Sequence, residues 1–231
     1  MLANVLVHWF LAGGPIMWPI LGCLLLAGTV LVERLVWWWS LTRRLNGPLL
    51  EEVLSAAGQG RWDRVVELVR RSDDPFLQTL RVGLEGANVS VVGAMQLRAA
   101  ELLDQAEKRL WVLSTMITLA PLLGLLGTVV GIMRSFHFLG DQTVAAARIS
   151  GGIAEALIAT ASGLFIAILC LLPYNWLSRR LSRMRGRLQR WIQHVDLLLE
   201  AQRARGVDWR AMVGGGSGAP SPSPARIFHD F

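Results

Sequence analysis

The residues of this sequence that could do chemistry are a few polar side chains inside long apolar runs. Glu155 is the only formally charged residue between positions 149 and 178. An acidic side chain in a membrane helix costs about 2.5 to 3.5 kcal/mol on insertion scales, so such residues usually face a protein interior or a water-filled path. Glu155 is therefore a candidate for proton exchange. The alternative is an interfacial carboxylate that pairs with Arg148 or with Arg134.

Two threonines, Thr128 and Thr160, are further polar candidates. A threonine in a membrane helix most often bonds its own backbone carbonyl one turn earlier, so neither residue alone indicates a function. Thr160 lies about 140° from Glu155 on an ideal helix, so the two need not line one wall. Small residues at spacings that allow close helix packing surround the threonines, and they are Gly124, Gly127, Gly131, Ala159 and Gly163.

No pattern typical of a soluble enzyme appears. Cys23 and Cys170 lie inside apolar runs without the spacing of a metal site or redox pair. The histidines are scattered, and Walker, Rossmann and nucleophile-elbow patterns are absent from the sequence. We therefore expect neither an enzyme nor a metal or cofactor site, so any energy must come from an ion gradient or a partner.

The composition requires a membrane. Hydrophobic residues make up 53% of the 231 positions and charged residues 17%, which is too apolar for an ordinary soluble domain. Three runs reach the roughly 20 residues that a crossing helix needs, and they span 15–39, 110–133 and 150–176. No charged residue precedes Glu33, so we expect the first run to be retained rather than cleaved as a signal peptide. The expected fold is all-α, an integral membrane protein with three transmembrane helices.

The segment 40–109 has a different character. Its charges alternate in sign and its apolar residues recur at helical spacing, which predicts a soluble helical domain. One predicted helix face holds Trp62, Val65, Val66 and Val69. Asp73, Asp74 and Pro75 should end that helix and cap the next. No proline lies between position 91 and the second span, so we expect one long helix projecting from the membrane.

The remaining segments complete the predicted domains. We expect segment 1–14 to be an N-terminal stretch outside the membrane and 134–149 a loop between two spans. An arginine-rich helix over 177–212 should leave the membrane, and the tail 213–231, rich in Gly, Pro and Ser, should be disordered. Glu33 and Arg34, one turn inside the tryptophans at 37–39, should form a structural pair.

Orientation follows from the positive charges near the span ends. Most of them lie on one side, which by the positive-inside rule is the cytoplasm. The N-terminus and the loop 134–149 should then be periplasmic, and the domain 40–109 and the C-terminal helix cytoplasmic. The arginines that follow the third span favour contact with anionic lipid over nucleic acid, and they are Arg179, Arg180, Arg183, Arg185, Arg187 and Arg190.

The last two spans resemble a known family. APLLGLLGTVVGIMRSF at 120–136 and GGIAEALIATASGLFIAI at 151–168 are similar to the second and third spans of MotA/TolQ/ExbB proton channels. GGPIMWPI at 13–20 and VERL at 32–35 resemble the first span of ExbB-type members. Three spans favour the TolQ/ExbB branch over MotA, and within that branch the GGP opening and compact size favour ExbB over TolQ.

The resemblance implies an assembly and roles for the polar residues. It implies a homopentamer in the bacterial inner membrane, with the second and third spans lining a pore around an ExbD/TolR-like single-span partner. A partner aspartate would carry the protons, and the motor would energise a TonB/TolA-like protein. By position, Thr128 and Thr160 match the residues that line the path, and Glu155 one that tunes it or contacts neighbouring subunits. The alternatives are a TolQ-like envelope-maintenance motor and a non-conducting scaffold of the same fold.

Overall fold

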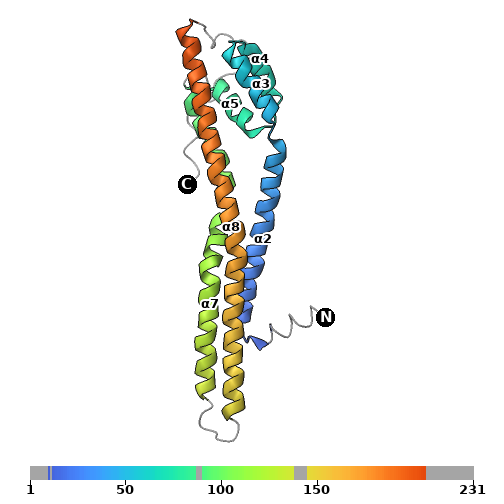
Figure 1. Cartoon of the computed structure of the whole chain (residues 1–231), viewed down its shortest axis with the longest axis vertical. Helices are drawn as coiled ribbons and strands as arrows, with labels where there is room; N and C mark the ends of the chain where they lie inside the picture. The colour runs from blue at the N-terminus through green and yellow to red at the C-terminus, as the bar shows by residue number, and fades with distance from the viewer. Residues whose placement is uncertain (1–9, 11, 87–89, 138–144, 207–231) are drawn as a thin grey trace, which may run out of the picture. The chain divides into compact units, whose positions relative to one another are not determined.

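The structure is a computed structural model that describes residue 10 and residues 12–86, 90–137 and 145–206. Within these ranges every regular element is an α-helix (Figure 1), which confirms the all-α prediction. The helices are α2 (Met17–Arg44), α3 (Gly47–Gly58), α4 (Trp62–Arg70), α5 (Pro75–Glu85), α6 (Val91–Glu107), α7 (Leu110–His137) and α8 (Ala145–Ala204).

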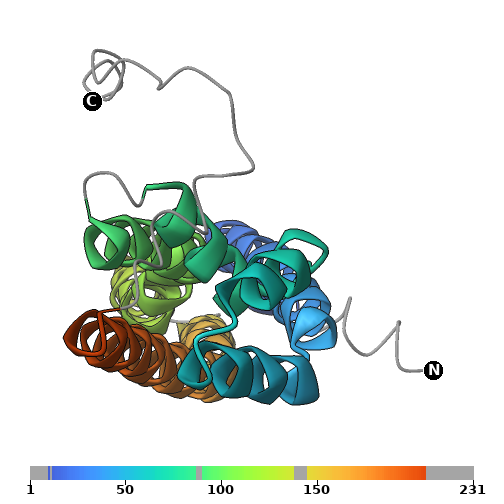
Figure 2. The ribbon, with the colours of Figure 1, turned by 90° about the horizontal axis from the view of Figure 1, so that it is seen from above.

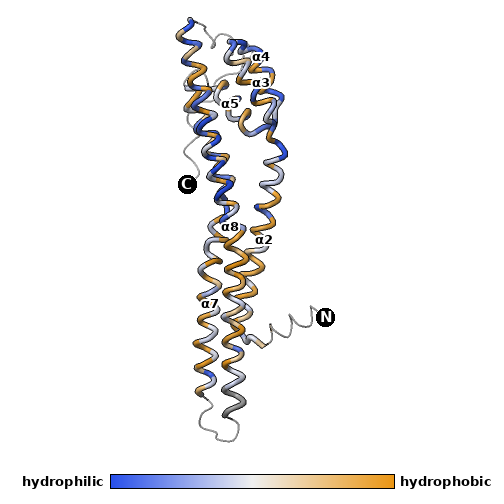
Figure 3. The backbone as a smooth tube through the Cα atoms, viewed as in Figure 1, coloured by the Kyte–Doolittle hydropathy of each residue, from blue (hydrophilic) through white to orange (hydrophobic). Residues whose placement is uncertain are grey.

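Three helical stretches of the described residues are long and apolar enough to cross a membrane. They are Met17–Arg44, Val91–Phe136 and Ser150–Ala204, with mean hydropathies of 1.9, 2.1 and 2.3 over their most apolar windows. Figure 3 shows the apolar part of α8 giving way to hydrophilic residues along one continuous helix. α7 runs on to His137 and α8 begins at Ala145, so both helices extend into the segment 134–149 that was expected to be a loop. No glycine or proline stands between Arg134 and His137 to stop α7.

The chain divides into two compact units, one made of Met1–Ser40 with Leu103–Met184 and the other of Leu41–Leu102 with Arg185–Phe231. In the first unit α2, α7 and the first part of α8 bury small and medium apolar side chains, among them Cys23, Ala120 and Cys170. Large apolar side chains such as Leu122 and Phe165 face outward. That distribution suits helices surrounded by lipid, because lipid solvates large apolar groups and small residues let backbones approach.

In the second unit α3 packs on α4 and α4 on α5 (Figure 2). The predicted apolar face of α4 is buried at Trp62, Val65 and Val69, while Val66 is half-buried. On the opposite face Arg64 pairs with Glu67 at 2.9 Å and with Glu52 at 3.2 Å. These carboxylates raise the pKa of the Arg64 guanidinium, first Glu67 and then Glu52. The amphipathic helix that the sequence predicts is therefore present.

The end of α8 is a core element of the second unit rather than a separate helix after the third span. Its apolar residues at helical spacing are buried, and they include Leu188, Trp191, Val195 and Leu199. Gln202, only 3% exposed, donates from Nε2 to the backbone oxygen of Ala57 at 3.2 Å. The domain predicted over 40–109 thus needs this part of α8 to complete its core, because its own short helices leave an apolar face to cover.

The expectation of one long helix from position 91 into the second span is wrong. α6 ends at Glu107 and α7 begins at Leu110. Between them Arg109 adopts a φ of 63°, the left-handed region that interrupts an α-helix. Side chains of α2 contact both sides of this break, because Arg34 donates to the backbone oxygen of Gln105 and Glu33 pairs with Arg109.

Asp74 joins α5 to the start of α3. Its Oδ1 accepts the backbone N–H of Phe76 at 2.8 Å, and its Oδ2 accepts that of Asn46 at 2.6 Å. Asp74 is 3% exposed, so Asp74→Ala would leave the buried N–H of Phe76 without its acceptor and remove the contact with the more exposed N–H of Asn46. We expect a loss of about 2 kcal/mol in the free energy of unfolding. Thermal unfolding of the detergent-purified protein, with the exposed Asp73→Ala as control, checks this result. Equal losses in both variants would contradict the cap.

Candidate functional site

The polar candidates lie along a close seam between α7 and the first part of α8. A Cβ atom built on Gly124 would stand 2.9 Å from the Cα of Thr160 and 3.0 Å from the oxygen of Ala159. The same test at Gly127 and Gly131 meets the Cβ atoms of Ala159 at 2.6 Å and of Ala156 at 2.9 Å. Two helices can approach this closely only where their residues are small.

Gly163 marks the tightest backbone contact of the seam. A Cβ atom at this position would overlap the backbone oxygen of Ala120 and stand 3.2 Å from the Cα of Gly124. Both neighbours are backbone atoms, which cannot turn away as a side chain can. The five small residues singled out in the sequence therefore all stand where α7 and α8 touch, and the backbone of Thr160 lies beside them.

Thr160 bonds across the seam. Its Oγ1 donates to the backbone oxygen of Gly124 at 2.8 Å, so the hydroxyl ties α8 to α7. Thr128 behaves as the general expectation for membrane threonines states, because its Oγ1 donates to the oxygen of Leu125 in its own helix at 2.7 Å. In this single chain Thr160 is an interhelical contact, and Thr128 is a half-buried group on the surface of α7.

Glu155 pairs with Arg134 of α7. The distance between Oε1 and Nη1 is 3.5 Å, and the two side chains are 31% and 53% exposed. Of the two partners that the sequence suggests, Arg134 is the one found, and the side chain of Arg148 lies outside the described residues. An ion pair this exposed in the single chain contributes little to stability where water reaches it, roughly 0.2 to 1 kcal/mol. The pair alone therefore restrains the carboxylate only weakly.

Gly14 also lies against the Glu155 carboxylate. A Cβ atom at Gly14 would overlap the Oε1 of Glu155 and stand 2.5 Å from its Cδ. No role was assigned to Gly14 from the sequence, because the GGP at 13–15 was used only as evidence of resemblance to ExbB-type members. Two adjacent glycines before a proline at the start of a helix are typical of a tight turn, so the turn itself could have been predicted from the sequence.

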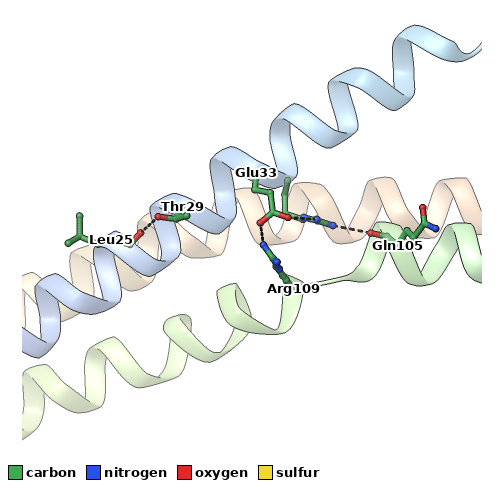
Figure 4. A network of polar contacts seen from close by, with 6 residues as sticks. Leu25, Thr29, Glu33, Gln105 and Arg109 are labelled. Atoms are coloured by element: carbon green, nitrogen blue, oxygen red, sulfur yellow. Dashed lines mark hydrogen bonds and ion pairs between the residues drawn. The ribbon is translucent and has the colours of Figure 1, made fainter. Parts of the chain in front are cut away.

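A second polar cluster surrounds Glu33 and Arg34, as Figure 4 shows. Arg34 Nη2 pairs with Glu33 Oε1 at 2.9 Å, which confirms the structural pair predicted from the sequence. Arg109 makes a second ion pair with the other carboxylate oxygen of Glu33. Arg34 is only 3% exposed, whereas the side chain of Glu33 is 37% exposed. The buried cation is thus neutralised by a carboxylate that also reaches solvent.

The same guanidinium compensates the break between α6 and α7. Arg34 Nη1 donates to the backbone oxygen of Gln105 at 2.9 Å. In an uninterrupted helix that oxygen would accept the N–H of residue 109, but the left-handed Arg109 ends the helix first. Arg34 therefore acts as a cap supplied by another helix, and Figure 4 shows its two partners, Glu33 and Gln105, in one network.

Arginines and tryptophans also meet at the end of the apolar part of the first unit. The guanidinium carbon of Arg180 lies 5.4 Å from the ring centre of Trp38 and 5.2 Å from that of Trp176. Arg34 lies 5.8 Å from the ring of Trp37. These distances suit cation–π attraction, and tryptophans of this kind favour the membrane interface. The contact between Arg180 and Trp38 links α8 to α2.

No group of three or more His, Cys, Asp or Glu residues that could hold a metal ion occurs in the ranges that the structure describes. Most of the histidines fall outside them, since His8 and His229 are not described and neither is the side chain of His137. The chemistry that the described residues offer is that of carboxylates, guanidinium groups and hydroxyls inside an apolar helix bundle.

Comparison with known proteins places this arrangement in a family. The model of the MotA/TolQ/ExbB proton channel family matches residues 72–190. The biopolymer transport protein ExbB-like 3 of Synechocystis sp. is 38% identical over 174 residues, which cover 71% of this chain and 81% of the relative. ExbB-like 1 of the same organism is 34% identical over 74% of this chain and 69% of its own length. The Tol-Pal system protein TolQ of Haemophilus influenzae is 38% identical over 47% of this chain and 48% of its own length. The chain therefore belongs to the MotA/TolQ/ExbB proton channel family.

Proposed function

We propose that this chain is the proton-channel subunit of an inner-membrane motor that uses the proton-motive force to energise a TonB-like protein for outer-membrane uptake. The observation that carries the proposal is the family match over residues 72–190, because it includes α7 and the membrane part of α8. The glycine-lined seam with its bonded threonine supports it, since two closely joined helices make a stiff wall for a pore.

The proposal includes an assembly. Five copies would surround the single span of an ExbD/TolR-like partner, with α7 and α8 lining the pore. The partner's aspartate would carry the protons, Thr128 and Thr160 would border its path, and Glu155 would tune it. The half-buried position of Thr128 on α7 supports this placement, because its side chain is only partly covered within the single chain. The bonded hydroxyl of Thr160 would act by fixing the backbone of Gly124 beside the path.

The N-terminus and the connection between α7 and α8 would face the periplasm. The helical domain over 40–109 and the end of α8 would face the cytoplasm. The concentration of arginines after Trp176 and after Trp39 supports this orientation through the positive-inside rule.

An ExbB-type role is preferred to a TolQ-type role because the compact size and the GGP at 13–15 resemble ExbB-type members. Coverage does not separate the two roles, since the ExbB-like proteins match 71% and 74% of the chain, the TolQ of Haemophilus influenzae 47% and the ExbB of Aquifex aeolicus 40%. Copurification from the native membrane with a TonB-like rather than a TolA-like protein tests that preference. Recovery of the TolA-like protein alone would assign the chain to an envelope-maintenance motor.

Proton flux tests the role of the site. The complex with its single-span partner is reconstituted in vesicles that contain a pH-sensitive dye. We expect Glu155→Gln and Thr160→Val each to lower the flux about tenfold, the effect of about 1.4 kcal/mol, because each loses one polar interaction and keeps its shape. Thr115→Val is the matched control, since Thr115 is exposed and bonds only its own helix at 2.9 Å.

The outcomes separate the alternatives. Size-exclusion chromatography must show the same oligomer for every variant. Full flux in both Glu155→Gln and Thr160→Val would remove these residues from the proton path. An assembled wild-type complex that conducts no protons would favour the non-conducting scaffold.

A further inference from the structure

We propose that the turn formed by Gly13 and Gly14 is a positioning element for Glu155, so that the start of the first span holds the acid of the third span against Arg134. Its effect on proton flux rests on the proposed function. The placement of the carboxylate does not, because it follows from contacts within one chain.

Gly14 leaves the space that the carboxylate occupies. Its φ is +71°, a backbone conformation that glycine adopts freely and other residues adopt only with strain. A Cβ atom here would overlap the Oε1 of Glu155 and stand 3.0 Å from its Cγ. The carboxylate therefore packs directly on the backbone of this turn, and any side chain at position 14 would displace it.

The turn also contacts both helices of the seam. A Cβ atom at the buried Gly13 would stand 3.1 Å from the Cγ2 of Ile158 in α8. Ile16 follows the turn by two positions. Its Cγ2 lies 3.3 Å from the position that a Cβ atom of residue 127 would occupy in α7. The start of the first span therefore contacts α8 through Gly13 and α7 through Ile16, close to Glu155.

Two groups then fix the carboxylate. The backbone of Gly14 lies on one side, and the guanidinium of Arg134 lies 3.5 Å from Oε1. With the side chain of Glu155 still 31% exposed, the ion pair alone leaves the carboxylate free to leave the guanidinium. The turn restricts that movement, which makes Gly14 a positioning residue that acts through Glu155 and takes no proton itself.

The test uses Gly14→Ala in the full-length protein, with Gly22→Ala and Gly28→Ala as controls. Both control glycines lie in α2, the helix that follows the turn, and a Cβ atom at either would meet nothing within 4 Å. The first readout is the rate at which dicyclohexylcarbodiimide labels Glu155, followed by mass spectrometry. We expect labelling about two- to fivefold faster in Gly14→Ala, the range that the loss of an exposed ion pair allows, and no change in the controls.

The second readout separates the overlap from the backbone strain. Glu155→Asp shortens the acid by one methylene and gives a Cβ atom at position 14 room. We expect this change to lower proton flux in the wild-type background and to raise it in the Gly14→Ala background. Strain alone would make Glu155→Asp harmful in both backgrounds, which would overturn the positioning role.

Each remaining outcome decides something. Unchanged labelling of Glu155 in Gly14→Ala overturns the inference. Faster labelling with unchanged proton flux supports the placement and removes Glu155 from the proposed proton path. If Gly14→Ala does not accumulate in the membrane, the double variant Gly14→Ala with Glu155→Asp should accumulate, and its failure to do so would also overturn the inference.

Discussion

Arg34→Ala is expected to lower the free energy of unfolding by about 3 kcal/mol, because it removes a buried cation with two hydrogen-bond partners. The guanidinium is 3% exposed and donates to the Glu33 carboxylate and to the backbone oxygen of Gln105. Without it the carbonyl at the end of α6 has no partner, and Glu33 keeps only Arg109. Thermal unfolding of the purified protein in detergent measures the loss.

Arg44→Ala is the matched control for this prediction. Arg44 lies on the same helix and is exposed, so its removal should change the free energy of unfolding by less than about 1 kcal/mol. A further variant, Arg109→Gly, loses the more exposed ion pair but relieves the strain of the left-handed φ, so its net loss should be smaller than that of Arg34→Ala. If Arg34→Ala were no more harmful than Arg44→Ala, Arg34 would not hold the joint between α6 and α7.

The break at Arg109 also shows what sequence reasoning could not reach. Apolar runs long enough to cross a membrane predict spans directly, because helix length and lipid thickness are physically linked. The interruption between α6 and α7 involves no glycine or proline. It depends on an arginine 71 positions earlier in the chain that supplies the missing donor. Local propensity carries no information about such a partner.

The two threonines illustrate the same limit within the site. Thr128 bonds its own helix, as the local rule for membrane threonines predicts. Thr160 breaks that rule because the backbone oxygen of Gly124 comes close enough to accept a hydrogen bond from its hydroxyl. The glycine spacing in α7 predicts that some helix packs closely there, but it does not say which helix or in which register.

Charged pairs and small residues together hold α7 in the first unit. At its start Arg109 pairs with Glu33 of α2, and near its end Arg134 pairs with Glu155 of α8. Between these ends the contacts are backbone against backbone, at Gly124 and its neighbours. An arrangement of this kind fixes α7 in rotation as well as in position, and the proposed pore lining would require this if Thr128 is to keep facing one way.

Gly163→Ala tests the middle of that arrangement, and we expect it to lower the free energy of unfolding by about 2 to 3 kcal/mol. The added methyl group would overlap the backbone oxygen of Ala120, so α7 and α8 would have to separate and the bond from Thr160 to Gly124 would lengthen.

Gly151→Ala is the matched control on the same helix, since a Cβ atom there meets nothing within 4 Å. Because alanine favours a helix over glycine by about 1 kcal/mol, this control should be neutral or stabilising. Opposite signs in thermal unfolding would identify the close approach at Gly163, rather than helix propensity, as the cause. A stabilising Gly163→Ala would mean that α7 and α8 have room to spare at this point and that the seam does not hold them together.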